Sequence, residues 1–430
     1  MKISDIVYKT VAEVDEMPRF DLASPPRVGK WYLQPVAWLL SFPETWKHHV
    51  TIRKHRMENL KGGYLLLCNH NAFFDFKVAT RAFFPRRANY VVAVDGFINR
   101  EQLMRNVGCI GKRKFITDIQ IVRQIKTSIH DHHQICALYP EARYALVGTT
   151  AVLPDSLGKL IKLLGAPVVT LITHGHHLQQ PVWNLRKRRL STSADMTQIL
   201  TAEDVKSLSI EEINRQVREA FVYDDYRYQI DHQIHIKEEF RAEGLHQPLY
   251  QCPHCLVEGK MNSKGNELFC EACNKRWQMD TLGQLHAQVG ETEFAHIPDW
   301  FEWIRQQVRQ QVKNGTYRID VEVDVDSLPN SSGFYRLGRA RLIHDAQGFH
   351  LTANWNGQPF EIHKAVAENY SVHIEYNYFG KGNAVSFSLP NDTYYMFPVD
   401  RQFPITKFHF GTEELYRHYI QKKDLKCAVI

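Results

Sequence analysis

The sequence lacks a hydrophobic run long enough to cross a lipid bilayer, which takes roughly 18 apolar residues. The nearest candidate, from Trp31 to Phe42, is short and is interrupted by Gln34 and Pro35. The first residues, Met1 to Asp5, are not followed by the apolar stretch of a secretory signal. We therefore expect a protein of the cytoplasm or of the inner face of a membrane, in peripheral contact with that membrane.

The composition also lacks the bias of a disordered chain. Of the 430 residues, 44% are hydrophobic and 23% are charged, which is ordinary for globular proteins. This length accommodates two or three domains. The formal net charge of +6 favours an acidic partner only weakly, because basic clusters are usually solvated.

The most informative stretch places a histidine, His70, five positions before a carboxylate, Asp75. It directly follows the apolar run Tyr64–Cys68, which reads as a buried strand. On a continuous helix, residues five apart point about 140° away from each other. The two side chains can therefore meet only if His70 lies in the turn after the strand and Asp75 enters the next helix.

A histidine oriented by a carboxylate, with no serine beside it, is a general base that suits a substrate hydroxyl as the nucleophile. Acyl transfer to an alcohol is the reaction that this arrangement favours. An isolated HxxxxD pattern is weak support, because such spacings arise by chance. Three further segments follow it: Gly108–Lys114, Leu138–Arg143 and Gly165–Leu171.

In order and spacing, these four segments resemble the motif blocks of the glycerophospholipid acyltransferases, typified by 1-acyl-sn-glycerol-3-phosphate acyltransferases. The resemblance covers roughly residues 30 to 240. It departs from the family at Arg113, which comes five residues after Gly108 instead of six. In the third block, which in the family reads Pro-Glu-Gly-Thr-Arg, Ala142 stands for the glycine, Arg143 for the threonine and Tyr144 for the arginine.

The resemblance implies that His70 is the general base and Asp75 its orienting carboxylate. It implies a fatty acyl group carried by acyl-carrier protein or acyl-CoA, and lysophosphatidic acid as an acceptor that becomes phosphatidic acid. Lys112, Arg113 and Arg143 are the predicted phosphate-binding residues, Arg113 first because a guanidinium holds phosphate bidentately. Glu141 is predicted to orient these cations.

A lipid acceptor has to be drawn from a membrane, so the aromatic segment from Trp31 to Phe42 is interpreted as a membrane-contacting helix. A core-packing helix is the alternative interpretation. Cations at Arg86–Arg87, Lys112–Lys114 and Arg186–Arg189 would suit an anionic leaflet.

Four of the eight cysteines form two Cys-x-x-Cys pairs, Cys252 with Cys255 and Cys270 with Cys273, separated by a hairpin-like stretch through Lys264–Asn266. This spacing is typical of a structural zinc ribbon with four thiolate ligands. Paired disulfides are the alternative, disfavoured in a reducing cytosol. The histidines at 174, 176 and 177 follow a strand and could border the catalytic cleft, but a metal site is not expected there.

Four domains follow from these patterns. Residues 1–245 are predicted to form an α/β acyltransferase domain with a layered sheet and flanking helices, with strands at 64–68, 90–94, 135–139 and 168–172. Residues 246–285 form the zinc ribbon and 286–316 a helical connector. Residues 317–430, with alternating short strands and a helix from Thr412 to Gln421, are predicted to form an antiparallel PH-like β-barrel closed by one helix.

Two other functions stay open on the sequence alone. A zinc ribbon beside basic clusters also occurs in nucleic-acid-binding proteins, but the aromatic residues here do not interleave with the cations, so no nucleic acid is expected. The altered third block allows an inactive lipid-binding scaffold or a transferase for another lipid acceptor.

Overall fold

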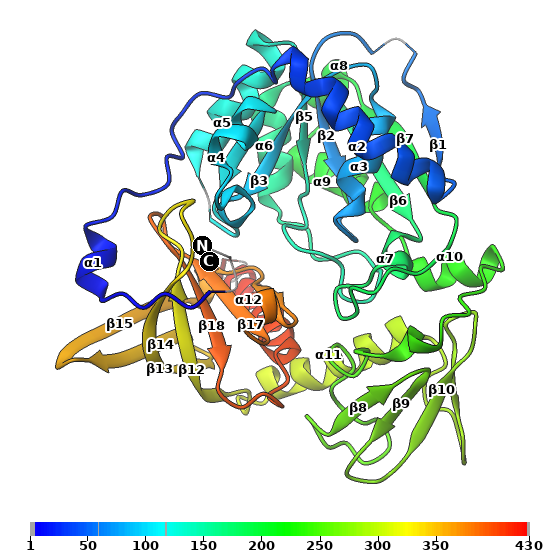
Figure 1. Ribbon diagram of the computed structural model, residues 1–430, viewed down its shortest axis with the longest axis vertical. Coiled ribbons are helices and arrows are strands. Elements are labelled where there is room, and N and C mark those ends of the chain that lie inside the picture. Colours follow the sequence, from blue (N-terminus) through cyan, green and yellow to red (C-terminus); the bar gives the residue numbers. More distant parts are fainter. Residues whose placement is uncertain (1–4, 59, 117, 428–430) are drawn as a thin grey trace.

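The computed structural model describes residues 5–58, 60–116 and 118–427, with side chains of the last helix described to residue 423. It consists of an α/β domain, a small four-stranded sheet that carries the cysteines, and a C-terminal antiparallel sheet (Figure 1). The three parts occur in the predicted order. The chain also contains the short helices α1 (Val11–Asp15), η1 (Trp31–Leu33), η2 (Val94–Phe97), η3 (Thr127–Asp131), η4 (Glu239–Ala242), η5 (Val366–Glu368) and η6 (Tyr378–Gly380).

Within the described ranges, no helix combines the length and the apolar character needed to span a membrane.

The α/β domain is built on a mixed seven-stranded sheet in which β7 runs antiparallel to β6 and the other neighbours are parallel. Its strands, in spatial order, are β1 (Thr51–His55), β7 (Ser193–Leu200), β6 (Val168–His174), β2 (Tyr64–Cys68), β5 (Ile135–Leu138), β3 (Ala88–Ala93) and β4 (Cys109–Lys112). The four predicted strands are present, and β1, β4 and β7 are additional. Strand β1 escapes a search for apolar runs because it is mostly exposed and carries Arg53, Lys54 and His55.

Helices cover both faces of this sheet, as the central strand β2 shows. All five of its residues are buried. Leu66 and Cys68 pack with α3 residues, whereas Leu65 and Leu67 face the helices of the other layer. A strand buried on both faces reads as a continuous apolar run, which is why the sequence indicated it. The helices of the domain are α2 (Gln34–Lys47), α3 (Phe74–Ala82), α4 (Glu101–Asn106), α5 (Ile119–Lys126), α6 (Ser156–Leu164), α7 (His176–Gln179), α8 (Ala202–Ser207), α9 (Ile210–Ala220) and α10 (Asp225–Asp231).

The cysteine-bearing segment folds as a four-stranded antiparallel sheet in the order β11-β10-β9-β8. Its strands are β8 (Met261–Lys264), β9 (Glu267–Cys270), β10 (Arg276–Met279) and β11 (Leu285–Ala287). The predicted hairpin is the turn between β8 and β9, where Gly265 adopts a φ of +62°. The long helix α11 (Ile297–Lys313) follows this sheet and leads to the C-terminal sheet.

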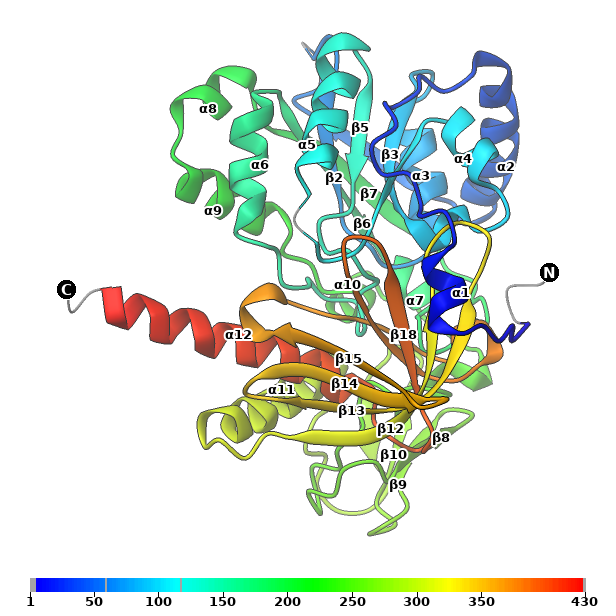
Figure 2. The ribbon, with the colours of Figure 1, turned by 90° about the vertical axis from the view of Figure 1, so that its left-hand side faces the viewer.

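The C-terminal strands form an open sheet, so the predicted closed barrel is wrong and a PH-like fold is not confirmed. The order is β15-β14-β13-β12-β18-β17-β16, with β15 and β16 at the two edges. The strands are β12 (Ile319–Ser327), β13 (Tyr335–Asp345), β14 (Gly348–Trp355), β15 (Gln358–Ala365), β16 (His373–Glu375), β17 (Ala384–Ser388) and β18 (Thr393–Pro398). The final helix α12 (Thr406–Cys427) lies along the sheet and extends past it (Figure 2). Edge strand β16 has only three residues, too short to close a barrel with β15.

The parts share their cores instead of packing as separate units. Leu328, Tyr395 and Phe397 of the C-terminal sheet belong to the same apolar cluster as α3 and β2 of the α/β domain. The N-terminal segment also reaches the C-terminal sheet, where the backbone N–H of Lys9 donates to the carbonyl of Arg336 at 3.1 Å. The interface between the α/β domain and the C-terminal sheet is therefore a fixed part of the fold, and the candidate site lies at it.

Candidate active site and cysteine cluster

The turn between β2 and α3 brings His70 and Asp75 together, as their spacing predicted. The Nδ1 atom of His70 lies 3.3 Å from Oδ2 of Asp75. Asp75 is in the first turn of α3 and is 1% exposed, whereas the His70 side chain is 22% exposed. The carboxylate holds Nδ1, so Nε2 is the nitrogen that remains for a substrate.

Asp75 is a buried carboxylate that receives hydrogen bonds on both oxygens. Its Oδ2 accepts from the backbone N–H groups of Asn71 at 2.6 Å and Ala72 at 2.9 Å. Burial alone would raise the pKa of Asp75, but hydrogen bonds from His176 and His70 outweigh it and lower the pKa to about 2. The carboxylate is therefore ionised and fixed, as an orienting partner of a general base requires.

His176 is a site residue that the sequence did not assign. Its Nδ1 lies 2.6 Å from Oδ1 of Asp75, and its side chain is fully buried against Phe74, with ring centroids 5.1 Å apart. It comes from α7, at the end of β6, where a cluster of histidines was expected to border the cleft. None of the three histidines lines the cavity that opens beside His70, and the link of His176 to the site is its contact with Asp75. Its contact with Asp75 could not be read from the sequence, because 106 positions and several strands of unknown order separate His70 from His176.

Glu141 stabilises the loop that carries His70, and none of its hydrogen bonds within the described residues comes from the cations that it was predicted to orient. Its Oε2 accepts the backbone N–H of His70 at 2.8 Å, and its Oε1 accepts that of Ala151 at 2.9 Å. The hydroxyl of Tyr223 donates to the same carboxylate at 3.2 Å. Complete burial raises the pKa of Glu141 to about 7 despite these bonds. Glu141 therefore acts on the position of the base through its backbone.

Two tyrosines hold the imidazole of His70 between them. The ring centroids of Tyr139 and Tyr144 lie 4.3 and 4.1 Å from that of His70. Between them in the chain, Ala142 has a φ of +55°, in the left-handed region that glycine favours. This is the residue that aligned with the glycine of the third block. Tyr144, which aligned with the arginine of that block, contacts the His70 ring and offers no positive charge.

A large cavity opens beside His70 between the α/β domain and the C-terminal sheet. Its volume is about 1460 Å³, and its walls are mostly apolar. Helices α5 and α6 supply aliphatic side chains such as Ile121 and Leu160, and α12 supplies Ile420. The C-terminal sheet contributes His373 and Glu375. Both domains therefore form the walls of the space that the candidate base faces.

The three neighbouring cations Lys112, Arg113 and Lys114 do not point to the same place. Lys112 and Lys114 line the cavity, whereas Arg113 does not and is 3% exposed. Its guanidinium donates to the carbonyls of Leu328 and Pro329 at 3.0 and 2.9 Å, and further to Thr393 and Asn391. The prediction that Arg113 is the first phosphate ligand is therefore corrected: Arg113 fastens the α/β domain to the C-terminal sheet.

Arg143 lines the cavity but is engaged by α12. Its guanidinium lies 3.4 Å from Oε1 of Glu413 and 3.3 Å from Nε2 of His409, and it is 5% exposed. Burial would raise the pKa of Glu413, but His409, Arg305 and Arg143 lower it well below its usual range. Arg143 is thus balanced by a carboxylate from the C-terminal helix, and its charge is less available to a ligand than that of Lys112.

Cys68, two residues before His70, is not a competent nucleophile. The thiol is 1% exposed, and burial raises its pKa far above the usual range. A buried, protonated thiol cannot attack a carbonyl carbon. Cys68 is therefore excluded as a partner for the candidate base.

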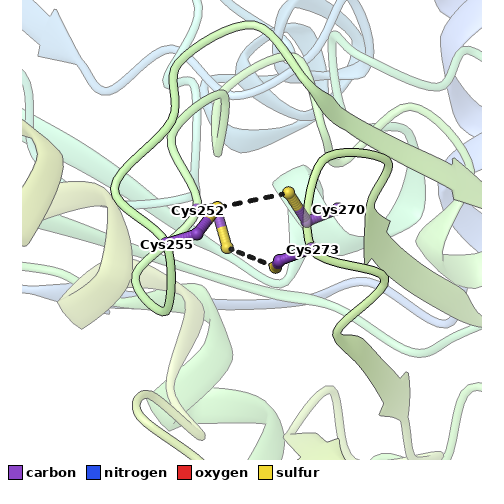
Figure 3. Close-up of side chains that lie close together, drawn as sticks. All are labelled: Cys252, Cys255, Cys270 and Cys273. Carbon is purple, nitrogen blue, oxygen red and sulfur yellow. Dashed lines mark hydrogen bonds between the residues drawn. The ribbon is translucent and has the colours of Figure 1, made fainter.

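The four cysteines of the ribbon converge on one point, although they come from two separate knuckles (Figure 3). All four sulfur atoms lie within 4.8 Å of one another, with 3.8 Å between Cys252 and Cys273 and 3.7 Å between Cys255 and Cys270. Four thiolates at about 2.3 Å from a tetrahedral zinc would be about 3.8 Å apart. A disulfide needs sulfur atoms about 2.05 Å apart, so the observed geometry fits a bound metal ion and not a pair of disulfides.

The two knuckles have the same backbone shape. The carbonyl of Cys252 accepts from the N–H of Leu256 at 3.0 Å, and that of Cys270 from Asn274 at 2.9 Å. The residue after the second cysteine of each pair is left-handed, with φ of +65° at Leu256 and +62° at Asn274. The repeated turn aims two sulfurs of each knuckle at the common point.

No model of a protein family matches this chain, and no curated protein does. Among solved structures, the chain is similar to the crystal structure of the 1-acyl-sn-glycerophosphate (LPA) acyltransferase PlsC from Thermotoga maritima. The sequences are 12% identical, the alignment covers 44% of this chain and 79% of that chain, and the TM-score is 0.36.

Proposed function

We propose that this protein is an O-acyltransferase that moves a fatty acyl group from acyl-carrier protein or acyl-CoA to the free hydroxyl of a lysophospholipid. Lysophosphatidic acid is the acceptor that we favour, with phosphatidic acid as the product. The observation that carries the proposal is the His70–Asp75 pair at the wall of a large, mostly apolar cavity. Burial raises the pKa of the neighbouring Cys68 thiol and of the Tyr139 and Tyr144 hydroxyls, so an oriented base here favours a nucleophile that the substrate brings.

In the proposed reaction, Nε2 of His70 takes the proton of the acceptor hydroxyl while its oxygen attacks the thioester carbonyl. Asp75 keeps the Nδ1–H tautomer and balances the charge that the ring gains. The tetrahedral intermediate then collapses, the carbon–sulfur bond breaks, and the leaving thiolate receives the proton from His70. The products are an ester and a free thiol, so the protein ends in its initial state.

The cavity suits a lipid on two counts. Its apolar walls between α5, α6 and α12 offer a fatty chain an apolar surface to pack against. Its cationic residues, Lys112 and Lys114, lie at the end of β4 and just beyond it, where they can meet an anionic head group. A transferase for another lipid acceptor would use the same base, and the acceptor panel below distinguishes the two.

Purified protein incubated with labelled acyl-carrier protein or acyl-CoA and a panel of lysolipids is expected to form one labelled diacyl product. We expect the highest kcat/KM with lysophosphatidic acid, because its phosphate monoester carries the charge that the lysines can bind. Chromatography of the lipid extract measures the product. Absence of any acylated lipid, with folded protein and every donor, would contradict the proposal and favour a lipid-binding scaffold.

We also propose that α2 contacts a membrane surface, since it buries polar side chains and exposes apolar ones, the reverse of a helix that packs on a core. Its buried side chains are Ser41 and Thr45. Its exposed side chains include Leu39 at 72% and Leu40 at 65%, and Trp31 just before it is 75% exposed. A helix that buries hydroxyls and exposes leucines has an unsatisfied apolar face, and a lipid interface can cover it.

Replacing both Leu39 and Leu40 by glutamate is expected to weaken binding to anionic phospholipid vesicles at least tenfold, because two buried apolar side chains contribute roughly 1.5–3 kcal/mol each. Co-sedimentation with vesicles measures the binding. Val222→Glu is the matched control, because Val222 is 76% exposed in a loop outside α2. Equal binding of the double variant and the wild type would remove α2 from the membrane contact.

A further inference from the structure

The segment 139–145 is hydrogen-bonded to both sides of the His70 backbone. The carboxylate of Glu141 accepts the backbone N–H of His70 at 2.8 Å, and the backbone N–H of Ala145 donates to the carbonyl of His70 at 2.7 Å. Between these two contacts, Ala142 turns the chain with a φ of +55°. Tyr144, directly before Ala145, is therefore fixed relative to the candidate base by the backbone as well as by the contact between the two rings.

The two tyrosines of this segment place their hydroxyls differently. The ring centroids of Tyr139 and Tyr144 lie 4.3 and 4.1 Å from that of His70, and both side chains line the cavity. The hydroxyl of Tyr139 is buried. The hydroxyl of Tyr144 has no hydrogen-bond partner among the described residues and is not buried in this way, so it keeps surface on the cavity. Tyr144 thus offers the cavity a free donor beside the base.

This hydroxyl keeps its proton. Burial raises the pKa of Tyr144 well above its usual range, and the nearby carboxylates of Glu375, Asp75 and Asp95 raise it further. A neutral phenol can donate a hydrogen bond and does not take a proton from a substrate. Its chemistry is therefore that of a donor and not of a second base.

The proposed reaction needs such a donor, because the attacked carbonyl oxygen becomes negatively charged in the tetrahedral intermediate. The backbone N–H groups next to the base are already in use. That of His70 donates to Glu141, and those of Asn71 and Ala72 donate to Asp75. The loop that carries the base therefore uses these N–H groups to hold two carboxylates, and a negative oxygen beside the base needs a donor from another segment.

We propose that the hydroxyl of Tyr144 donates a hydrogen bond to the oxyanion that forms on the thioester carbonyl, so that Tyr144 is a catalytic residue beside His70. A phenol oxygen stands one ring radius and one bond from the centre of its ring. Contact between the phenol and the imidazole therefore brings it near a carbonyl that is attacked by a hydroxyl held at Nε2 of His70. No proton leaves Tyr144 in this step. The assignment rests on the proposed function.

Tyr144→Phe in the full-length protein is expected to lower kcat by about 10² to 10³, the cost of removing one oxyanion donor, with the KM of both substrates little changed. The variant should stay folded, because the lost hydroxyl makes no hydrogen bond within the described residues and phenylalanine keeps the ring that packs on His70. Steady-state kinetics with both substrates at saturation measures kcat. Thermal unfolding of the same sample reports the fold.

Tyr139→Phe is the matched comparison, because Tyr139 packs on the same imidazole but buries its hydroxyl. It should lower kcat far less than Tyr144→Phe does. Equal losses in the two variants would show that packing around His70 causes the effect, and would overturn the role of the Tyr144 hydroxyl.

Hydrolysis of acyl-CoA without an acceptor separates the oxyanion role from acceptor binding. Water then takes the place of the acceptor, and the thioester gives a fatty acid and a thiol through an oxyanion on the same carbonyl. We expect Tyr144→Phe to lower this slow hydrolysis by the same factor as the transfer reaction. Unchanged hydrolysis together with a raised KM for the acceptor would place the hydroxyl on the acceptor instead and would contradict the proposal.

The remaining outcomes distinguish this proposal from the proposed function. Wild-type kcat in a folded Tyr144→Phe protein would refute the role of Tyr144 alone and leave the acyl transfer by His70 standing. A wild-type protein that neither transfers nor hydrolyses any acyl group would refute the proposed function, and the oxyanion role with it.

Discussion

Replacement of His70 by alanine is expected to lower kcat by about 10² to 10⁴, the contribution of a positioned general base. The fold should survive, because the His70 side chain is partly exposed and Glu141 holds the loop through the backbone N–H and not through the imidazole. Steady-state kinetics with a saturating donor measures the loss. Thermal unfolding of the same sample shows whether the protein is folded. A folded His70→Ala protein with near wild-type kcat would remove the mechanism.

Asp75→Asn should have a comparable effect on kcat, and the double variant should be little worse than either single one, because the two residues act as a unit. Since the pKa of Asp75 is about 2, its carboxylate remains ionised above pH 4. A fall in rate on acidification from neutral pH to pH 5 therefore reports protonation of a group other than Asp75.

His176 supplies a graded comparison within the same experiment. His176→Asn keeps a side-chain N–H near the position of Nδ1, so it should retain most of kcat. His176→Leu removes this donor and leaves Oδ1 of Asp75 without its 2.6 Å partner. We expect a loss in kcat smaller than that of Asp75→Asn, with KM little changed. Equal activity of the leucine and asparagine variants would show that His176 only fills space.

The sequence was sufficient for the dyad because the relevant geometry is local. A continuous apolar run marks a strand buried on both faces, and the residues that follow it have to be in the loop and the first turn of the next helix. Two side chains within six residues then have few ways to be arranged. The same argument worked for the cysteine knuckles, where a tight turn sets the direction of both sulfurs.

The phosphate residues could not be ranked in this way, because their directions depend on a distant part of the chain. Arg113 is the better phosphate ligand by chemistry, but the oxygens of Leu328 and Pro329, more than 200 positions away, bind its guanidinium first. The lysines beside it then face the cavity.

The closed barrel was predicted wrongly for a related reason. Alternating strands indicate how many half-buried strands a domain has, but closure depends on whether the two edge strands pair. That pairing is a long-range property, and here β16 has only three residues. Strand β16, which carries His373, lines the cavity together with the neighbouring helix α12. The open edge of the sheet therefore forms part of the wall of the candidate site.

The cysteine ribbon shares its apolar core with the neighbouring helix α11. Its inward side chains, Leu268, Trp277 and Met279, belong to one apolar cluster with Trp300 and Ile304 of α11. The indole rings of Trp277 and Trp300 are 4.9 Å apart. Loss of a metal from the knuckles would therefore loosen both the ribbon and the helix that connects it to the C-terminal sheet.

We propose one tightly held zinc per chain, bound by Cys252, Cys255, Cys270 and Cys273, with a structural role. Elemental analysis should find one equivalent of zinc, and Cys255→Ser should lose it. Structural zinc contributes roughly 10–16 kcal/mol to the folding of isolated zinc-finger peptides at neutral pH. Even a fraction of that free energy would lower the melting temperature by many degrees, because domains are stable by only about 5–15 kcal/mol.

Cys136→Ala is the control for the effect of losing a buried cysteine, since Cys136 lies in β5 of the α/β domain and is fully buried. It should keep its zinc even if its stability falls. Four thiolates leave no open coordination position, so added zinc should restore activity only to the extent that it restores folded protein. A metal-free protein with the melting temperature and kcat of the zinc-loaded form would refute the structural role, because the buried knuckles would then need no metal to hold their sulfurs together.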